Sequence, residues 1–222
     1  MDQDIIETGT NLTIFHQKHS VAIRIWHWVL FLFISGSMIT VLLASTLLDP
    51  HTNVGMIQEQ LNKKGVIVTE EQAFAVTHKY EDLIWEIHKW IGIGLVILLL
   101  ARMVIEFAVP ADQKIRNRIK NAIGLYNKFD KKQGEYLHYL SVKRVYMIFY
   151  LLLFCMSFTG LGLAFGHELH LSRPTHHFLK TIHNLGQYGM YAFVFIHLCG
   201  VIIAENNKIK GIVSGMIHGK LP

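Results

Sequence analysis

Cysteine is scarce in this chain of 222 residues, which contains only two. Cys155 and Cys199 lie in different apolar stretches, and neither belongs to a CxxCH or CxxC pattern. These spacings disfavour covalently attached haem c, a zinc ribbon and a disulfide framework. Small packing residues inside helices are the better interpretation of both cysteines.

Charge is also sparse, because charged residues make up 17% of the sequence and hydrophobic residues 51%. That balance is too apolar for an ordinary soluble domain. Four apolar runs reach the roughly 20 residues that a hydrocarbon core of about 30 Å requires. They cover residues 21–48, 83–109, 145–165 and 178–204. The sequence therefore predicts an all-α fold, a membrane-embedded bundle of four transmembrane helices in which residues 1–222 form a single domain.

The polar lead, residues 1–20, lacks the basic n-region of a signal peptide, and the first apolar run is too long for one. We therefore expect the first helix to be retained as an anchor. Lysine and arginine are concentrated in the connection between the second and third runs and in the tail, whereas the first connection carries more acidic than basic residues. This asymmetry predicts a multi-pass protein of the cell inner membrane with both termini cytoplasmic. The net charge of +5 then reflects topology and contact with membrane lipid, and no nucleic-acid partner is expected.

Fourteen histidines are present, and only four of them lie within or just inside the apolar runs: His27, His88, His183 and His197. On a helix rising about 1.5 Å per residue, His183 and His197 are about 21 Å apart and return to nearly the same face. Matching the depths of the four residues pairs His27 with His197 and His88 with His183. Each pair joins two helices, as bis-histidine ligation of a b-type haem requires, so we predict two haem b groups with these four histidines as iron ligands.

Small and basic residues surround the predicted ligands. Glycines near them let a macrocycle or another helix approach the backbone: Gly92, Gly160, Gly162, Gly186, Gly189 and Gly200. Arg24 lies one turn before His27, where it is a candidate partner of a haem propionate. Arg102 lies fourteen residues after His88 and is a second propionate or quinone-headgroup candidate, and Lys89 flanks the outer pair.

Simpler interpretations exist for each residue taken alone. A histidine beside tryptophan near a helix end is typical of the membrane interface, where Trp26, Trp28, Trp85 and Trp90 would form an aromatic belt. Arg24 alone is compatible with snorkelling to lipid phosphates. Arg102 and Glu106 are one turn apart and suit an internal ion pair. The joint occurrence of two depth-matched histidine pairs is what favours the haem interpretation.

Several motifs resemble the bacterial di-haem cytochrome b family, which includes cytochrome b561 and the membrane cytochrome b subunits of nickel–iron hydrogenases, formate dehydrogenases and thiosulfate reductases. The resemblance runs from about Ser20 onward and rests on R-x-x-H-W (Arg24, His27, Trp28), on His88 with Trp90 and Gly92, on H-x13-H, on FTGLGL (Phe158–Leu163) and on GIVSGMIHGK (Gly211–Lys220). It implies a four-helix bundle that carries electrons between an outer-side partner, hydrogenase-, dehydrogenase- or cytochrome c-like, and a quinone near the inner haem. The same four histidines are the ligands that it implies.

The connections carry further expectations. The long Asp49–Asp82 connection is compatible with an extra helix, and its segment Val54–Lys79 is expected on the outer membrane surface, as a docking surface or a passive interfacial helix. The basic segment Tyr126–Leu140 suggests contact with anionic lipid. Near the inner haem, candidates for a quinone site are Arg102, Glu106, His138, Ser141 and Lys143. The outer-loop histidines His167, His170, His176 and His177 are best interpreted as solvated, although the HxxH motif at His167 and His170 is also compatible with a metal site.

Three alternatives to a membrane electron-transfer subunit are considered. A stand-alone cytochrome oxidising quinol or superoxide needs no partner, and the long outer connection argues mildly against it. A proton-relay transporter predicts deep acidic residues and broken helices, but only Glu86 and Glu106 approach that pattern. A purely structural anchor does not require paired histidines.

Overall fold

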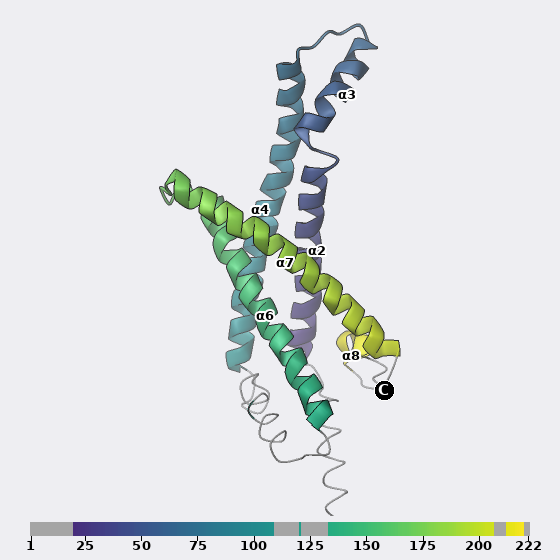
Figure 1. The fold of residues 1–222 in the computed structure, drawn as a ribbon, viewed down its shortest axis with the longest axis vertical. Coiled ribbons are helices and arrows are strands. Elements are labelled where there is room, and N and C mark those ends of the chain that lie inside the picture. Colours follow the sequence, from purple (N-terminus) through teal and green to yellow (C-terminus); the bar gives the residue numbers. More distant parts are fainter. Residues whose placement is uncertain (1–19, 109–119, 121–132, 207–211, 220–222) are drawn as a thin grey trace, which may run out of the picture. The chain divides into compact units, whose positions relative to one another are not determined.

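The computed structural model describes residues 20–108, 120, 133–206 and 212–219, with the side chains of residues 108, 133–140, 142, 143 and 212 excepted. Every regular element in this part of the chain is a helix (Figure 1). In chain order the helices are α2 (Val21–Ser45), α3 (Pro50–Asn62), α4 (Glu70–Ala108), α6 (Gln133–Ala164), α7 (Arg173–Asn206) and α8 (Ile212–His218). Of the predicted lipid-contact segment Tyr126–Leu140, residues 126–132 and the side chains of residues 133–140 lie outside the described part, as does the side chain of Lys143.

In the described part of the chain, four helices are long and apolar enough to cross a membrane: Val21–Ser45, Glu70–Phe107, Arg144–Ala164 and Arg173–Asn206. Large apolar side chains on them face outward, and Leu32, Leu151 and Phe195 are 65%, 69% and 70% exposed. Such exposure is costly in water and costs nothing in hydrocarbon, where a helix also satisfies its own backbone groups. The prediction of an all-α membrane protein with four spans is confirmed.

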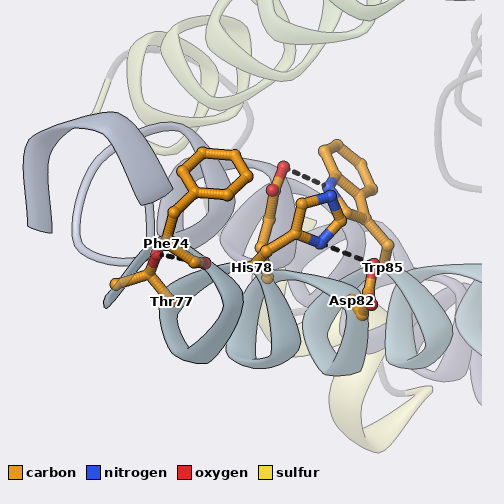
Figure 2. Close-up of polar contacts among 6 residues, drawn as sticks. Phe74, Thr77, His78, Asp82 and Trp85 are labelled. Carbon is orange, nitrogen blue, oxygen red and sulfur yellow. Dashed lines mark hydrogen bonds and ion pairs between the residues drawn. The ribbon is translucent and has the colours of Figure 1, made fainter. Parts of the chain in front are cut away.

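Helix α4 begins at Glu70, well before the predicted start of the second span at residue 83. A capping box starts it: the Thr69 backbone N–H donates to Gln72 Oε1 at 2.9 Å, and the Gln72 N–H donates to Thr69 Oγ1 at 3.2 Å. Figure 2 shows the polar side chains that follow, where His78 Nδ1 lies 3.3 Å from Asp82 and Trp85 Nε1 lies 2.9 Å from Glu81. These contacts one turn apart stabilise a polar stretch of helix that hydropathy alone does not detect.

The extra helix that the Asp49–Asp82 connection suggested is α3. Asp49 caps it by accepting hydrogen bonds from the His51 N–H at 3.1 Å and the Thr52 hydroxyl at 2.9 Å. Its end is followed by Gly65 at φ 76°, a conformation that glycine adopts without strain. The segment Val54–Lys79 is therefore not one element, because α3 and the first turns of α4 share it.

The chain forms two compact units. Unit 1 comprises Met1–Trp28, Arg102–Phe149 and Gly186–Pro222, and unit 2 comprises Val29–Ala101 and Tyr150–Leu185. The single domain expected from the sequence stays a prediction.

Each unit has buried side chains of its own. Those of unit 1 include Trp26, Phe149 and Met190. Those of unit 2 include Leu30, Ile34, Ala44, Ala73 and Leu153. Trp26, at 8% exposed, is thus a packing residue and not part of an aromatic belt at the lipid surface.

Candidate functional site

His88 of α4 and His183 of α7 face each other in unit 2. Their ring centroids are 6.4 Å apart and the ring planes are nearly perpendicular, at 88°. Both side chains are half-buried. Trp85, one turn before His88 on α4, packs its ring edge against that imidazole at 5.5 Å.

A threonine hydroxyl contacts each imidazole of this pair. Thr40 Oγ1, from α2, lies 2.8 Å from His88 Nδ1, and Thr159 Oγ1, from α6, lies 2.9 Å from His183 Nδ1. Both threonines are buried, at 5% and 3% exposed. The pair is therefore held from two further helices.

His27 of α2 and His197 of α7 form the corresponding pair in unit 1. Their ring centroids are 6.3 Å apart, with an angle of 57° between the planes. Phe193 stacks on His197 at 5.9 Å, and Trp28 contacts His27 edge-on at 5.5 Å. The His27 Nδ1 atom is buried and has no hydrogen-bond partner among the described residues.

Both centroid distances suit one metal ion held between two rings. A metal-bound imidazole nitrogen lies about 2 Å from the metal and about 1 Å from its own ring centroid, so a linear arrangement separates the centroids by about 6 Å. The observed 6.3 and 6.4 Å match this spacing. Imidazole nitrogen is a donor suited to iron, and two donors leave four positions for a planar ligand.

The glycines near the pairs divide into two groups. A Cβ added to Gly92 or Gly200 would meet nothing within 4 Å, so these two face open space. A Cβ on Gly160 would lie 3.2 Å from His183 Cε1, and one on Gly162 would lie 2.7 Å from Leu179. Gly160 and Gly162 therefore allow α6 to approach α7, whereas Gly92 and Gly200 leave room for a flat ligand.

The two predicted arginines both lie in unit 1 and have protein partners there. Arg24 Nη1 donates to the Ile217 carbonyl at 2.9 Å, which joins α2 to α8. Arg102, 9% exposed, donates to Glu106 at 3.0 Å and lies 5.8 Å from the centre of the Trp26 ring. The internal ion pair considered for Arg102 and Glu106 is thus present.

A comparison with protein families gives a match over residues 18–219 to the model of prokaryotic cytochrome b561. The chain belongs to this family. A search of curated proteins found no match. A search of solved structures found none either.

Membership of the cytochrome b561 family means that the chain is an integral membrane b-type cytochrome that takes part in electron transfer and binds b haem. The residues present fit such a group. Two imidazole pairs whose ring centroids leave space for one metal ion, and open space at Gly92 and Gly200, are compatible with a porphyrin.

Other residues singled out in the cytochrome sequence are not gathered at these pairs. Lys89 contacts Glu86 at 3.6 Å and lies 6.0 Å from the ring centres of Trp90 and Phe165. Ser141 is exposed.

A cavity of about 550 Å³ is lined by Gly166, His167, Leu171, Arg173, His176, His177 and Lys180. No group of three His, Cys, Asp or Glu side chains within metal-binding reach occurs in the described part of the chain, and His167 and His170 lie in a turn, not on a helical face.

Sequence reasoning missed Thr40 and Thr159. Each lies in an apolar span, and each contacts a histidine on another helix. Because the packing of the helices decides which side chains meet, no residue spacing along the chain predicts these contacts.

Proposed function

We propose that this cytochrome holds two b haems, one between His27 and His197 and one between His88 and His183, and transfers electrons across the membrane between a redox partner and the quinone pool. The spacing of the two imidazole pairs carries the proposal, because both pairs leave room for one iron. When bound, each b haem supplies an iron centre that accepts and releases one electron.

The four histidines would hold the haem irons in this proposal. Helix α7 contributes one to each pair, so a single helix would position a ligand for both centres. An iron held by two imidazoles would have little capacity to bind oxygen directly. The rings of Phe193 and Trp85 pack against the imidazoles of His197 and His88.

Arg24 is proposed to hold a propionate of the haem between His27 and His197. Its Nε is buried with no hydrogen-bond partner in the described residues, while Nη1 bonds to Ile217. A carboxylate is the group that a buried guanidinium N–H binds best. Arg102 is the second candidate, and its pairing with Glu106 also suits a quinone headgroup, which needs a proton donor or acceptor beside it.

The proposed orientation of the chain in the membrane rests on the distribution of its lysines and arginines. Because basic residues gather in the connection between the second and third spans and in the tail, we propose that the termini are cytoplasmic, with His27 and His197 near that side. The redox partner then meets the α3–α4 connection on the opposite side. Exposed apolar residues there, Met56, Val66 and Ile67 among them, suit a protein contact.

A proton-relay transporter is less well supported. Glu86 pairs with Lys89 and Glu106 with Arg102, and α2, α4 and α7 are continuous through their apolar stretches. Carboxylates in ion pairs and unbroken helices do not provide the midplane site that such a transporter needs. A stand-alone quinol or superoxide oxidoreductase remains the alternative within the redox class.

The test is the dithionite-reduced minus oxidised spectrum of the purified full-length protein, combined with haem and protein quantification. We expect a b-type α band and two haems per chain. No haem contradicts the proposal outright, and one haem contradicts one of the two pairs. Adding quinol analogues then tests the quinone site, which is absent if the reduced spectrum and the re-oxidation rate stay unchanged.

A further inference from the structure

Thr40 and Thr159 make similar contacts from two different helices, although the Thr159 hydroxyl also lies 3.3 Å from the carbonyl oxygen of Met156. The Thr40 hydroxyl lies 2.7 Å from the carbonyl oxygen of Ser37 as well as 2.8 Å from His88 Nδ1. The Thr159 hydroxyl lies 2.7 Å from the carbonyl oxygen of Cys155 as well as 2.9 Å from His183 Nδ1. Each hydroxyl thus bridges a backbone carbonyl of its own helix to an imidazole on another.

The number of protons fixes the direction of these bonds. A hydroxyl has one hydrogen, and a carbonyl oxygen can only accept, so the hydroxyl hydrogen of Thr40 points to Ser37. The hydroxyl oxygen must then accept from His88 Nδ1–H. The same reasoning assigns the hydrogen of His183 to Nδ1. Each ring is left with an unprotonated Nε2, which is the form that binds a metal.

The other pair lacks this arrangement at His27. Its Nδ1 is buried without a hydrogen-bond partner in the described part of the chain. The imidazole of His27 therefore lies in a different setting from those of His88 and His183. When the ring nitrogen that does not bind the metal donates its N–H to a hydrogen-bond acceptor, the imidazole becomes a stronger electron donor to the metal.

We infer that Thr40 and Thr159 are positioning residues that fix the tautomer and ring orientation of His88 and His183 and thereby lower the reduction potential of the haem between them. The physical reason is that a stronger donor stabilises ferric over ferrous iron. This inference rests on the proposed bis-histidine ligation and concerns one haem only.

Thr77, in the same unit, provides a matched control for a purely structural role of a buried threonine hydroxyl. Buried threonines in apolar helices often return their hydroxyl to a backbone carbonyl without further function. Thr77 does so, with Oγ1 donating to the Phe74 carbonyl at 2.9 Å and a residue exposure of 4%. Thr77 is therefore as buried as Thr40, and Thr77→Val removes an equivalent hydroxyl.

The experiment is an equilibrium redox titration of the α band in the full-length haem-loaded protein, with Thr40→Val, Thr159→Val, Thr40→Ser, Thr159→Ser and Thr77→Val. His197→Ala, which leaves only the His88–His183 pair, assigns the two transitions. The low-spin ferric EPR signal of each haem gives a second readout that does not depend on turnover.

Both valine variants are expected to raise the potential of the His88–His183 haem alone. A tenfold loss of preference for ferric iron converts to 59 mV for one electron. The serine variants should keep the wild-type potential and Thr77→Val should change neither. If a valine variant loses this haem while its serine counterpart retains it, the inference also holds, because the hydroxyl is then required to present the ligand.

Three results overturn the inference. In the first, both haem reduction potentials are unchanged in Thr40→Val and in Thr159→Val. In the second, these variants shift the potentials of both haems equally. In the third, Thr77→Val shifts the potential of the His88–His183 haem by the same amount as they do. In each case the protein still binds two haems, so the proposed function stands. A wild-type protein without haem contradicts the proposed function itself.

Discussion

Arg24 of α2 and Ile217 of α8 are joined by a hydrogen bond of 2.9 Å from the guanidinium Nη1 to the backbone carbonyl. The last carbonyls of a helix have no partner within it, so a cationic donor stabilises them. Gly219 follows at φ 71°, and a Cβ there would lie 2.7 Å from Arg24 Cζ. Trp28 adds a second bond, from Nε1 to the Met216 carbonyl at 3.1 Å. Two members of the R-x-x-H-W motif thus hold the C-terminal helix against the turn of α2 that carries His27.

Arg24→Gln is expected to loosen α8. A hydrogen bond to a charged group contributes about 1.5–3 kcal/mol, so local opening of Ile212–His218 should become more frequent. Hydrogen exchange in lipid nanodiscs measures this directly. Trp28→Phe is the matched control, which removes the neutral bond and should give a smaller effect. Unchanged exchange in α8 for both variants would contradict the role assigned to these bonds.

Single histidine substitutions should remove one haem each. His183→Ala removes a ligand of the unit 2 pair and is expected to behave like His88→Ala, whereas His197→Ala should behave like His27→Ala. Haem quantification and the reduced spectrum distinguish the two classes. Two haems retained in His197→Ala would contradict the pairing in unit 1, and loss of both haems in every variant would show that the centres do not form independently.

Gly200→Ala and Gly160→Ala are expected to impair haem binding in different ways. A Cβ at Gly200 meets no protein atom within 4 Å, so the haem-free protein should keep its stability while haem binding weakens. A Cβ at Gly160 meets His183 Cε1 at 3.2 Å, so this change should displace the ligand ring even without haem. Thermal unfolding with and without haem measures the difference. Normal haem affinity in Gly200→Ala would mean that no macrocycle lies against that glycine.

Glu106→Gln should destabilise the protein and slow electron exchange with quinol. Its carboxylate pairs with Arg102, whose side chain is 11% exposed, so losing this charged hydrogen bond costs about 1–3 kcal/mol. Glu86→Gln is the control, because the Glu86–Lys89 pair is more exposed and such pairs contribute less than about 1 kcal/mol. Melting temperature and quinol-linked haem reduction are the measurements. Lower stability with an unchanged quinol rate would limit the Arg102–Glu106 pair to a structural role.

The spans could be predicted from sequence because hydrophobic length is a local property. A run of about 20 apolar residues must be helical in hydrocarbon whatever its neighbours are. For the same reason, the apolar pattern does not show where α4 begins. Its first turns are polar and are stabilised by the Thr69–Gln72 capping box and by contacts such as His78–Asp82, which a hydropathy pattern does not register.

The sequence by itself determined four apolar helices long enough to cross a membrane, and it predicts the depths of His27, His88, His183 and His197, because helix rise converts residue number into depth. Only the tertiary structure decided what each side chain touches. The contact of Thr40 with His88, that of Thr159 with His183, the turn of Arg24 toward α8 and the burial of Trp26 all depend on how helices are rotated and packed. Rotation about a helix axis leaves hydropathy unchanged, and it selects which polar atoms meet between helices.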